Sequence, residues 1–162
     1  MATGNVVRIF LHFNWTTKYR EPLITSEMEK IIRDVAFEQA AHLGCYVIAV
    51  DGTEDHRHLL IASPATVTAS DIMKRVKGGS SHMINELGFQ DTTGRAFRWQ
   101  NKYAVFSVSD WAVNRVKKYI ERQKKHHKSN TLIANLEVQE EDLELEDLEG
   151  EAGKETESPA VD

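Results

Sequence analysis

Two histidines separated by one residue, His56 and His58, stand at the start of the apolar run HRHLLIAS. Alternate side chains of an extended strand project to opposite faces, so these imidazoles point the same way, about 7 Å apart, while Arg57 points the other way. Two imidazoles on one face can bind a single divalent metal ion. They can equally be ordinary strand histidines, and the pair alone leaves both interpretations open.

A second group of reactive residues lies in the basic segment RVKKYIERQKKHHK, residues 115–128. Tyr119 and Gln123 are four residues apart, which places them on one face of a helix. We expect this face to be polar and basic, with Val116 and Ile120 on the opposite, packing stripe. An ordinary tyrosine of an amphipathic helix is the alternative interpretation of Tyr119.

These residues suggest a chemistry of phosphodiester transfer. A phenol has a pKa near 10 and is a poor nucleophile, but a metal ion on the scissile phosphate makes its attack easier. Two histidines and a glutamine carbonyl leave open coordination positions and are compatible with magnesium or manganese. Attack by Tyr119 would then produce a covalent phosphotyrosine link.

The remaining pattern predicts the elements that must position this group. Apolar periodicity, helix caps and turn residues predict strands over 5–17, 45–52 and 56–63, and helices over 25–44, 66–88 and 110–129. RAFRWQ (95–100) and KYAVFSVS, with its core at 103–109, predict a fourth strand. Gly78 and Gly79 predict a bend or break in the second helix. The order is that of an α+β, ferredoxin-like β-α-β-β-α-β antiparallel sheet with an added C-terminal helix. Its first and third strands should be neighbours at the centre, with helices on one face.

Particular residues are expected to end or anchor the helices. Thr25 or Ser26 should cap the first helix, which Gly44 should end. Ser109 or Asp110 should cap the last, and its apolar anchors should be Trp111, Val113, Val116 and Ile120.

The charge of the chain is unevenly distributed. Residues 136–162 contain twelve acidic residues and one lysine, a net charge of −11, whereas residues 1–135 have a net charge of +6. We therefore expect a basic catalytic domain over 1–135 and a largely disordered acidic tail over 136–162 that competes with nucleic acid or simply aids solubility. The one cysteine, Cys45, excludes an internal disulfide, and without an apparent signal peptide or membrane span we expect a cytoplasmic protein.

Basic side chains indicate a nucleic-acid surface, because cations bind the phosphate backbone. Lys74, Arg75 and Lys77 should combine with the basic last helix, and Gly78 and Gly79 either admit phosphate or form a bend. Trp99 is expected to be partly exposed, and Trp15, Tyr19 and Tyr103 are further candidates for stacking on bases. The predicted DNA-binding residues are Lys74, Arg75, Lys77, Arg115, Lys117, Lys118, Arg122, Lys124 and Trp99.

Four motifs in order, DHRHLLI, KGGSSHMINE, WQNKYAVFSVS and VKKYIERQKKHH, resemble the single-tyrosine HUH (histidine–hydrophobic–histidine) transposases of small bacterial insertion sequences. The similarity covers about residues 5–130. It implies a divalent metal on His56, His58 and Gln123, with Tyr119 as the nucleophile. It also implies single-stranded DNA with hairpins near the element ends as substrate, a 5′-phosphotyrosine intermediate and a homodimer.

The chain departs from the family pattern at two places. Arg57 stands where the motif usually has an apolar residue, and we expect its charged head to reach water. The acidic tail is not part of the pattern. Two alternatives to a transposase remain open: a catalytically silent nucleic-acid-binding protein derived from such an enzyme, and an unrelated metal-dependent hydrolase.

Overall fold

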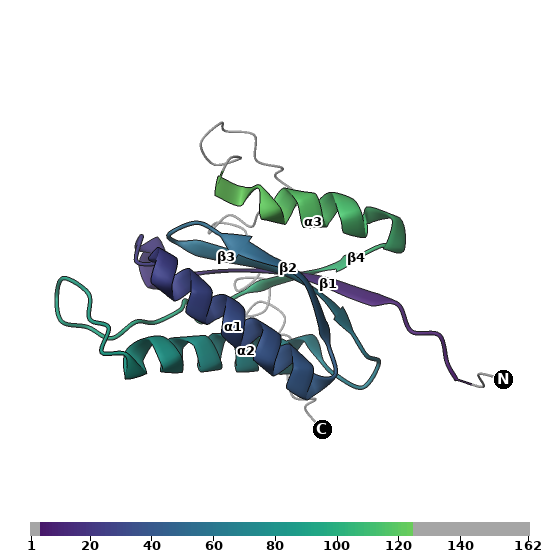
Figure 1. Ribbon diagram of the computed structural model, residues 1–162, viewed down its shortest axis with the longest axis horizontal. Coiled ribbons are helices and arrows are strands. Elements are labelled where there is room, and N and C mark those ends of the chain that lie inside the picture. Colours follow the sequence, from purple (N-terminus) through teal and green to yellow (C-terminus); the bar gives the residue numbers. More distant parts are fainter. Residues whose placement is uncertain (1–3, 125–162) are drawn as a thin grey trace, which may run out of the picture. The chain divides into compact units, whose positions relative to one another are not determined.

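The computed structural model describes residues 4–124, all of which belong to one compact unit. The predicted order of elements is confirmed (Figure 1). The elements are β1 (Ile9–Thr16), α1 (Ser26–Leu43), β2 (Tyr46–Gly52), β3 (His56–Ser63), α2 (Ala69–Glu86), β4 (Ala104–Val108) and α3 (Val113–Glu121), with short 3-10 helices η1 (Lys18–Arg20) and η2 (Asp110–Ala112).

The strands form one antiparallel sheet in the order β2-β3-β1-β4. β1 and β3 are neighbours at the centre, as the sequence predicts, and their register runs from Ile9 opposite Ser63 to Thr16 opposite His56. β1 also pairs with β4, where His12 lies opposite Phe106. The two-residue periodicity of each central strand therefore decides which side chains reach each face of the sheet.

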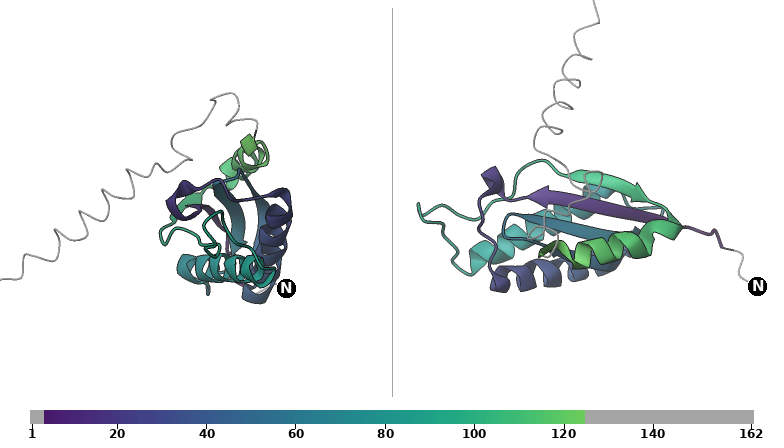
Figure 2. Two further views of the ribbon diagram at one scale, coloured as in Figure 1. Left: turned by 90° about the vertical axis from the view of Figure 1, so that its left-hand side faces the viewer. Right: turned by 90° about the horizontal axis from the view of Figure 1, so that it is seen from above.

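The helices lie on both faces of the sheet. α1 and α2 pack together on one face and α3 lies on the other, an arrangement that two further views repeat (Figures 1 and 2). The main apolar core fills the space under α1 and α2 and includes Phe13, Leu59, Ile61, Ile32, Ile72 and Val76. The prediction of helices on one face thus holds for α1 and α2, while α3 covers part of the face that the sequence left open.

Local signals account for the ends of α1. Thr25 caps the helix, because its hydroxyl oxygen accepts a hydrogen bond from the amide of Met28 at 3.3 Å. Gly44 ends it in the left-handed region, with φ of 71°, as expected for a glycine after a helix. Cys45 follows directly and is half-buried against the main core.

The predicted bend at Gly78 and Gly79 is wrong, since α2 is one continuous helix. A Cβ on Gly79 would lie 2.9 Å from Cγ1 of Val35 in α1, so the missing side chain lets the two helices approach closely. The backbone amides there belong to a continuous helix, which leaves no open glycine loop for phosphate.

The chain before β4 also differs from the prediction. Residues 95–100 are not a strand, and only Trp99 makes an isolated bridge, to Thr17. Trp99 was expected to be partly exposed but is buried in the main core, where its indole nitrogen donates to the hydroxyl of Ser80 at 3.0 Å. A base cannot stack on it there.

The last helix is shorter and differently anchored than expected. The 3-10 helix η2 leads directly into α3, which ends at Glu121. A turn at Arg122 separates α3 from two further helical residues, 123 and 124. The rest of the predicted span lies outside the described residues. Neither Ser109 nor Asp110 caps it through a side-chain hydrogen bond; instead Asp110 accepts one from Arg8 at 3.0 Å. Trp111, an expected anchor, is 88% exposed, whereas Val116 and Ile120 are buried.

Candidate active site

One stripe of α3 faces the sheet and carries two of the predicted site residues. Val116, Tyr119, Ile120 and Gln123 follow the i, i+3, i+4, i+7 spacing of a buried helix face, and all four are buried. The prediction that Tyr119 lies on the exposed basic face, opposite Val116 and Ile120, is therefore wrong. Its ring packs under the helix and its side chain is only 3% exposed.

The two histidines of β3 lie beneath this stripe. His56 and His58 point away from the main core, as predicted, and are 1% and 0% exposed. Their ring centroids are 5.2 Å apart, and the ring of His58 meets that of Tyr119 edge to face at 6.2 Å. The fold thus brings together His56, His58, Tyr119 and Gln123, which the sequence proposed as one group.

His56 is held through both ring nitrogens. Its Nδ1 lies 2.7 Å from Oδ1 of Asp55 and 2.9 Å from the hydroxyl of Thr53, while its Nε2 lies 3.3 Å from Oε1 of Gln123. Metal-binding histidines typically engage a carboxylate through the nitrogen that does not bind the metal. Asp55, the residue directly before the histidine pair, therefore orients the imidazole.

The electrostatics of Asp55 follow from these contacts. Burial raises its pKa, but hydrogen bonds from His56 and Thr53 and the charges of His56 and Arg20 outweigh burial and lower the pKa to about 2. The guanidinium of Arg20 lies 3.8 Å from the carboxylate. Asp55 is consequently an anion at neutral pH, fixed beside the imidazole that it orients.

His58 has a different neighbour, which the sequence analysis did not select. His12 of β1 is buried on the same face, and its Nε2 lies 2.8 Å from Nδ1 of His58. The signal was present in the sequence, because His12 alternates with apolar Leu11 and Phe13 on a strand predicted to lie beside the histidine pair.

The donor set fits a divalent cation. No group of three or more histidine, cysteine or acidic side chains within residues 4–124 is arranged to hold a metal, so any site here depends on the amide of Gln123. Nε2 of His56 and Oε1 of Gln123 lie 3.3 Å apart, and when the imidazole is neutral and donates from Nδ1 to the Asp55 carboxylate, both atoms carry lone pairs. A cation would then bind between these two atoms.

Behind the histidines lies a cluster of ion pairs around the buried Arg57. Arg57 points to the α1 side, as predicted, but its head is buried, 2.9 Å from Glu29 and 3.7 Å from Asp51. The expectation that it reaches water is wrong, because these carboxylates pair with it inside the protein. Lys124 pairs with the same two acids at 2.8 and 3.4 Å.

These ion pairs also fix the end of α3. Burial raises the pKa of Glu29, but hydrogen bonds and charges from Lys124 and Arg57 outweigh burial and lower it. Lys124 directly follows Gln123, so these ion pairs connect the end of α3 to α1 and β2. Lys124 was predicted to bind DNA; here it is occupied with Glu29 and Asp51.

The other predicted DNA-binding residues do not form one surface. Lys74 and Arg75 are exposed on α2, across the sheet from α3, while Lys77 donates to main-chain carbonyls of Gln100, Asn101 and Lys102, and burial lowers its pKa to about 8. A shared surface with the last helix is therefore excluded for these positions.

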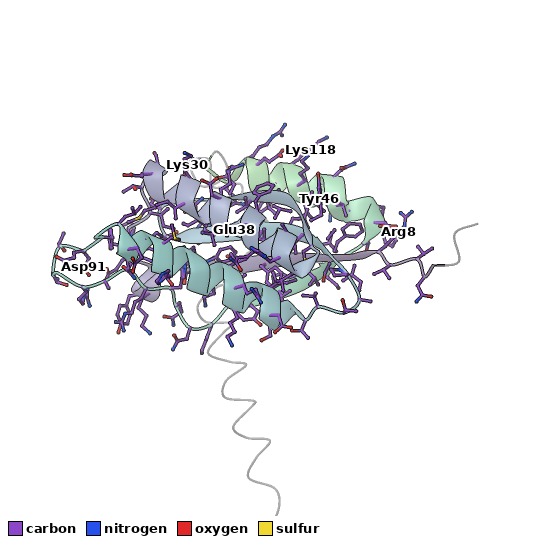
Figure 3. The ribbon with its side chains drawn as sticks, turned by 60° about the horizontal axis from the view of Figure 1, so that its bottom comes forward. Arg8, Lys30, Glu38, Tyr46, Asp91 and Lys118 are labelled. Carbon is purple, nitrogen blue, oxygen red and sulfur yellow. The ribbon has the colours of Figure 1, made fainter. Side chains whose placement is uncertain are left out.

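α3 presents its own basic face to solvent. Arg115, Lys118 and Arg122 are exposed, and Lys118 projects away from the sheet (Figure 3). Lys117 is half-buried, 4.0 Å from Glu121. Among the proposed stacking residues, Trp15 is buried and Tyr103 packs against the core, whereas Tyr19 is 65% exposed.

Comparison with known proteins agrees with this fold and identifies the family. Residues 5–123 match the model of the family described as IS200-like transposases, and the chain belongs to that family. It is therefore a transposase of the single-tyrosine type, a class of DNA-cleaving enzymes. None of the helices within residues 4–124 is long and apolar enough to cross a lipid bilayer.

Particular relatives can be named. The chain is 27% identical to the ISDra2 transposase TnpA of Deinococcus radiodurans over 122 residues, which cover 74% of this chain and 87% of the relative. A crystal structure of a protein described as a transposase from D. radiodurans R1 superposes with a TM-score of 0.60 at 25% identity, covering 76% of this chain and 96% of that one. A REP-associated tyrosine transposase bound to a REP hairpin shares the fold, with a TM-score of 0.58 at 13% identity over 78% and 74% of the two chains.

Proposed function

We propose that this transposase cleaves and rejoins single-stranded DNA through a covalent link between Tyr119 and a 5′-phosphate. The observation that carries the proposal is the packing of the Tyr119 ring against His58 in the buried site that also contains His56 and Gln123. A phenol beside potential metal-binding groups is the combination that phosphodiester transfer to tyrosine requires.

His56, His58 and Gln123 would hold a divalent cation, magnesium or manganese, through imidazole nitrogens and an amide oxygen. When bound, such a cation withdraws charge from a phosphodiester and so acts as a Lewis acid. Asp55 keeps the His56 imidazole oriented for this role through its contact at Nδ1.

In the cleavage step, the phenolic oxygen of Tyr119 attacks the phosphorus atom. The new bond joins that oxygen to phosphorus, and the bond from phosphorus to the 3′ oxygen of the leaving strand breaks. The phenol loses a proton and the released 3′ oxygen gains one. Attack by the 3′-hydroxyl of another strand reverses the step, which rejoins DNA and frees Tyr119.

Substrate access requires movement of α3. Because Tyr119, His56, His58 and Gln123 are all at most 3% exposed, a DNA phosphate reaches the phenol only after the helix shifts from the sheet. The ion pairs of Lys124 with Glu29 and Asp51 connect the end of this helix to the rest of the domain and would break in that movement.

The exposed basic face of α3, with Arg115, Lys118 and Arg122, supports contact with the DNA backbone. We further propose that the substrate carries hairpins near the element ends, which the complex of the REP-associated relative with a hairpin supports. The homodimer, the cytoplasmic location and the division at residues 135 and 136 stay predictions.

The test uses the full-length protein with labelled single-stranded DNA and Mg²⁺ or Mn²⁺. Tyr119→Phe should abolish both strand cleavage and the covalent protein–DNA adduct, because phenylalanine has no oxygen nucleophile. Tyr46→Phe is the matched control, since Tyr46 is 72% exposed and lies outside the site. An undiminished adduct in the Tyr119 variant would falsify the assignment, and DNA binding without any adduct in the wild type would favour the silent binding protein.

A further inference from the structure

His12 is a buried polar residue to which the proposed reaction assigns no role. It lies on β1, two residues from the position paired with His58, and its side chain is fully buried. The planes of the two rings differ by only 24°, and Nε2 of His12 lies 2.8 Å from Nδ1 of His58. A ring-nitrogen lone pair lies in the ring plane, so this geometry suits an N–H···N hydrogen bond.

The direction of that hydrogen bond decides what His58 can do. If His12 donated, His58 would accept at Nδ1 and carry its own proton at Nε2, where it could not bind a cation. If His58 donates from Nδ1, its Nε2 carries the lone pair and can act as a metal ligand. Only the second arrangement is compatible with the proposed metal site.

We propose that His12 is a positioning residue, which accepts a hydrogen bond from Nδ1 of His58 and thereby sets the tautomer that leaves the lone pair on Nε2. The choice of this tautomer rests on the proposed metal site, but the tautomer itself can be measured separately in the metal-free protein. His12 acts on His58 as Asp55 acts on His56, but with a neutral acceptor where Asp55 supplies a carboxylate.

A purely structural role would be filled better by another residue. The position is fully buried between strands and next to Phe106, whose ring centroid is 6.1 Å from that of His12. An apolar side chain would fill this space without the cost of removing an imidazole from water. The hydrogen bond to His58 is a contact that histidine makes here and leucine cannot make.

The test compares three full-length variants. His12→Leu removes the acceptor while keeping much of the volume, and His12→Gln restores an acceptor through its amide oxygen. Phe106→Leu is the control for altered packing beside His12. For each protein, calorimetry with Mn²⁺ alone measures the affinity for the metal, nitrogen NMR of the metal-free protein reports the tautomer of His58, and thermal unfolding reports folding.

The expected result is a loss of Mn²⁺ affinity of about 10- to 100-fold in His12→Leu, with most of it recovered in His12→Gln and none lost in Phe106→Leu. The His58 signals should move away from the Nδ1–H tautomer only in His12→Leu. Wild-type affinity in His12→Leu, or equal losses in the leucine and glutamine variants, would overturn the proposal.

The two hypotheses can fail separately. A wild-type protein that binds no Mn²⁺ would refute the metal site of the proposed function, and the nitrogen signals of His58 would then decide the role of His12 by themselves. If His12→Leu does not fold, His12→Gln still decides, since the proposal requires it to keep the wild-type tautomer of His58.

Discussion

On one face of the sheet, Leu59 and Ile61 of β3 pack beneath α1 and α2 in an apolar core. On the other face, His58 of the same strand lies beneath α3 beside Tyr119. Leu59 and His58 are adjacent in the chain and equally buried, at 0% exposure. One strand thus contributes to two interiors of opposite chemistry, because successive side chains project to opposite faces.

The two interiors are stabilised by different forces. Removal of apolar surface from water stabilises the α1 and α2 side in proportion to the area buried. Burial of histidines on the α3 side costs free energy unless their nitrogens find partners, and Asp55 and His12 supply these. The first interior should therefore respond mainly to changes of volume, and the second to loss of a hydrogen-bonding partner or to a change of pH.

The largest expected effect on stability comes from comparing substitutions at two neighbouring residues of β3, Leu59 and His58. Leu59→Ala should lower the free energy of unfolding by about 2–5 kcal/mol, because it leaves a cavity in the main core. His58→Ala should cost less than half as much, since an imidazole gains less than leucine on leaving water, yet it should abolish metal-dependent cleavage. Urea unfolding and the cleavage assay measure the two effects.

Both variants share the same strand and the same burial, so each serves as the control for the other. Equal losses of stability would contradict the distinction between the two faces. Cleavage by a folded His58→Ala protein at the wild-type rate would place the metal elsewhere.

The next effect tests the close packing of α1 on α2. Gly79→Ala should destabilise the protein by about 1–2 kcal/mol, because overpacking against Val35 outweighs the higher helix propensity of alanine. Gly78→Ala is the matched control, since a Cβ there meets nothing within 4 Å, and it should stabilise by about 0.5–1 kcal/mol. Thermal and urea unfolding measure both.

The opposite signs at adjacent glycines identify the cause as the contact with Val35. Adding Val35→Ala to the Gly79 variant should relieve the overlap and recover part of the loss. A stabilising Gly79→Ala substitution would show that α1 and α2 can separate at no cost.

The last effect concerns pH on the α3 side. The pKa of Asp55 in the folded chain, about 2, is below its ordinary value of 3.8, so the ionised carboxylate stabilises the fold. This contribution, about 1–2 kcal/mol after allowance for partial exposure, is fully present above about pH 4 and is lost as the pH falls towards 2.

Unfolding of the metal-free wild type and of Asp55→Asn, measured between pH 6 and pH 2, isolates this term. The wild type should be the more stable protein at pH 6, and the difference should shrink as the pH falls. A difference that stays constant with pH would mean that the charge of Asp55 contributes nothing to stability.

The sequence by itself determined the order of the elements and the shared face of the histidine pair. Both are local properties, since periods of two and 3.6 residues and a capping threonine act over a few neighbouring residues. His56 and His58 therefore project together whatever packs over them. The resemblance of four motifs was likewise sufficient to indicate the family.

Only the tertiary structure decided how these elements contact one another. Tyr119 and Gln123 share a helix face in any context, but whether that face meets solvent or the sheet depends on where α3 packs. Arg57 reads as an exposed cation in the sequence but is buried, and Glu29, which pairs with it and with Lys124, comes from a distant part of the chain.

His12 shows the same division most clearly. Its alternation on β1 was evident in the sequence, whereas its hydrogen-bonding distance to His58 depends on the register of β1 against β3. If β1 slipped by one residue against β3, His12 would project to the face of the sheet opposite to that of His58. The register is fixed by the turns and by the packing of the apolar face of the sheet against α1 and α2, and these are properties of the whole fold.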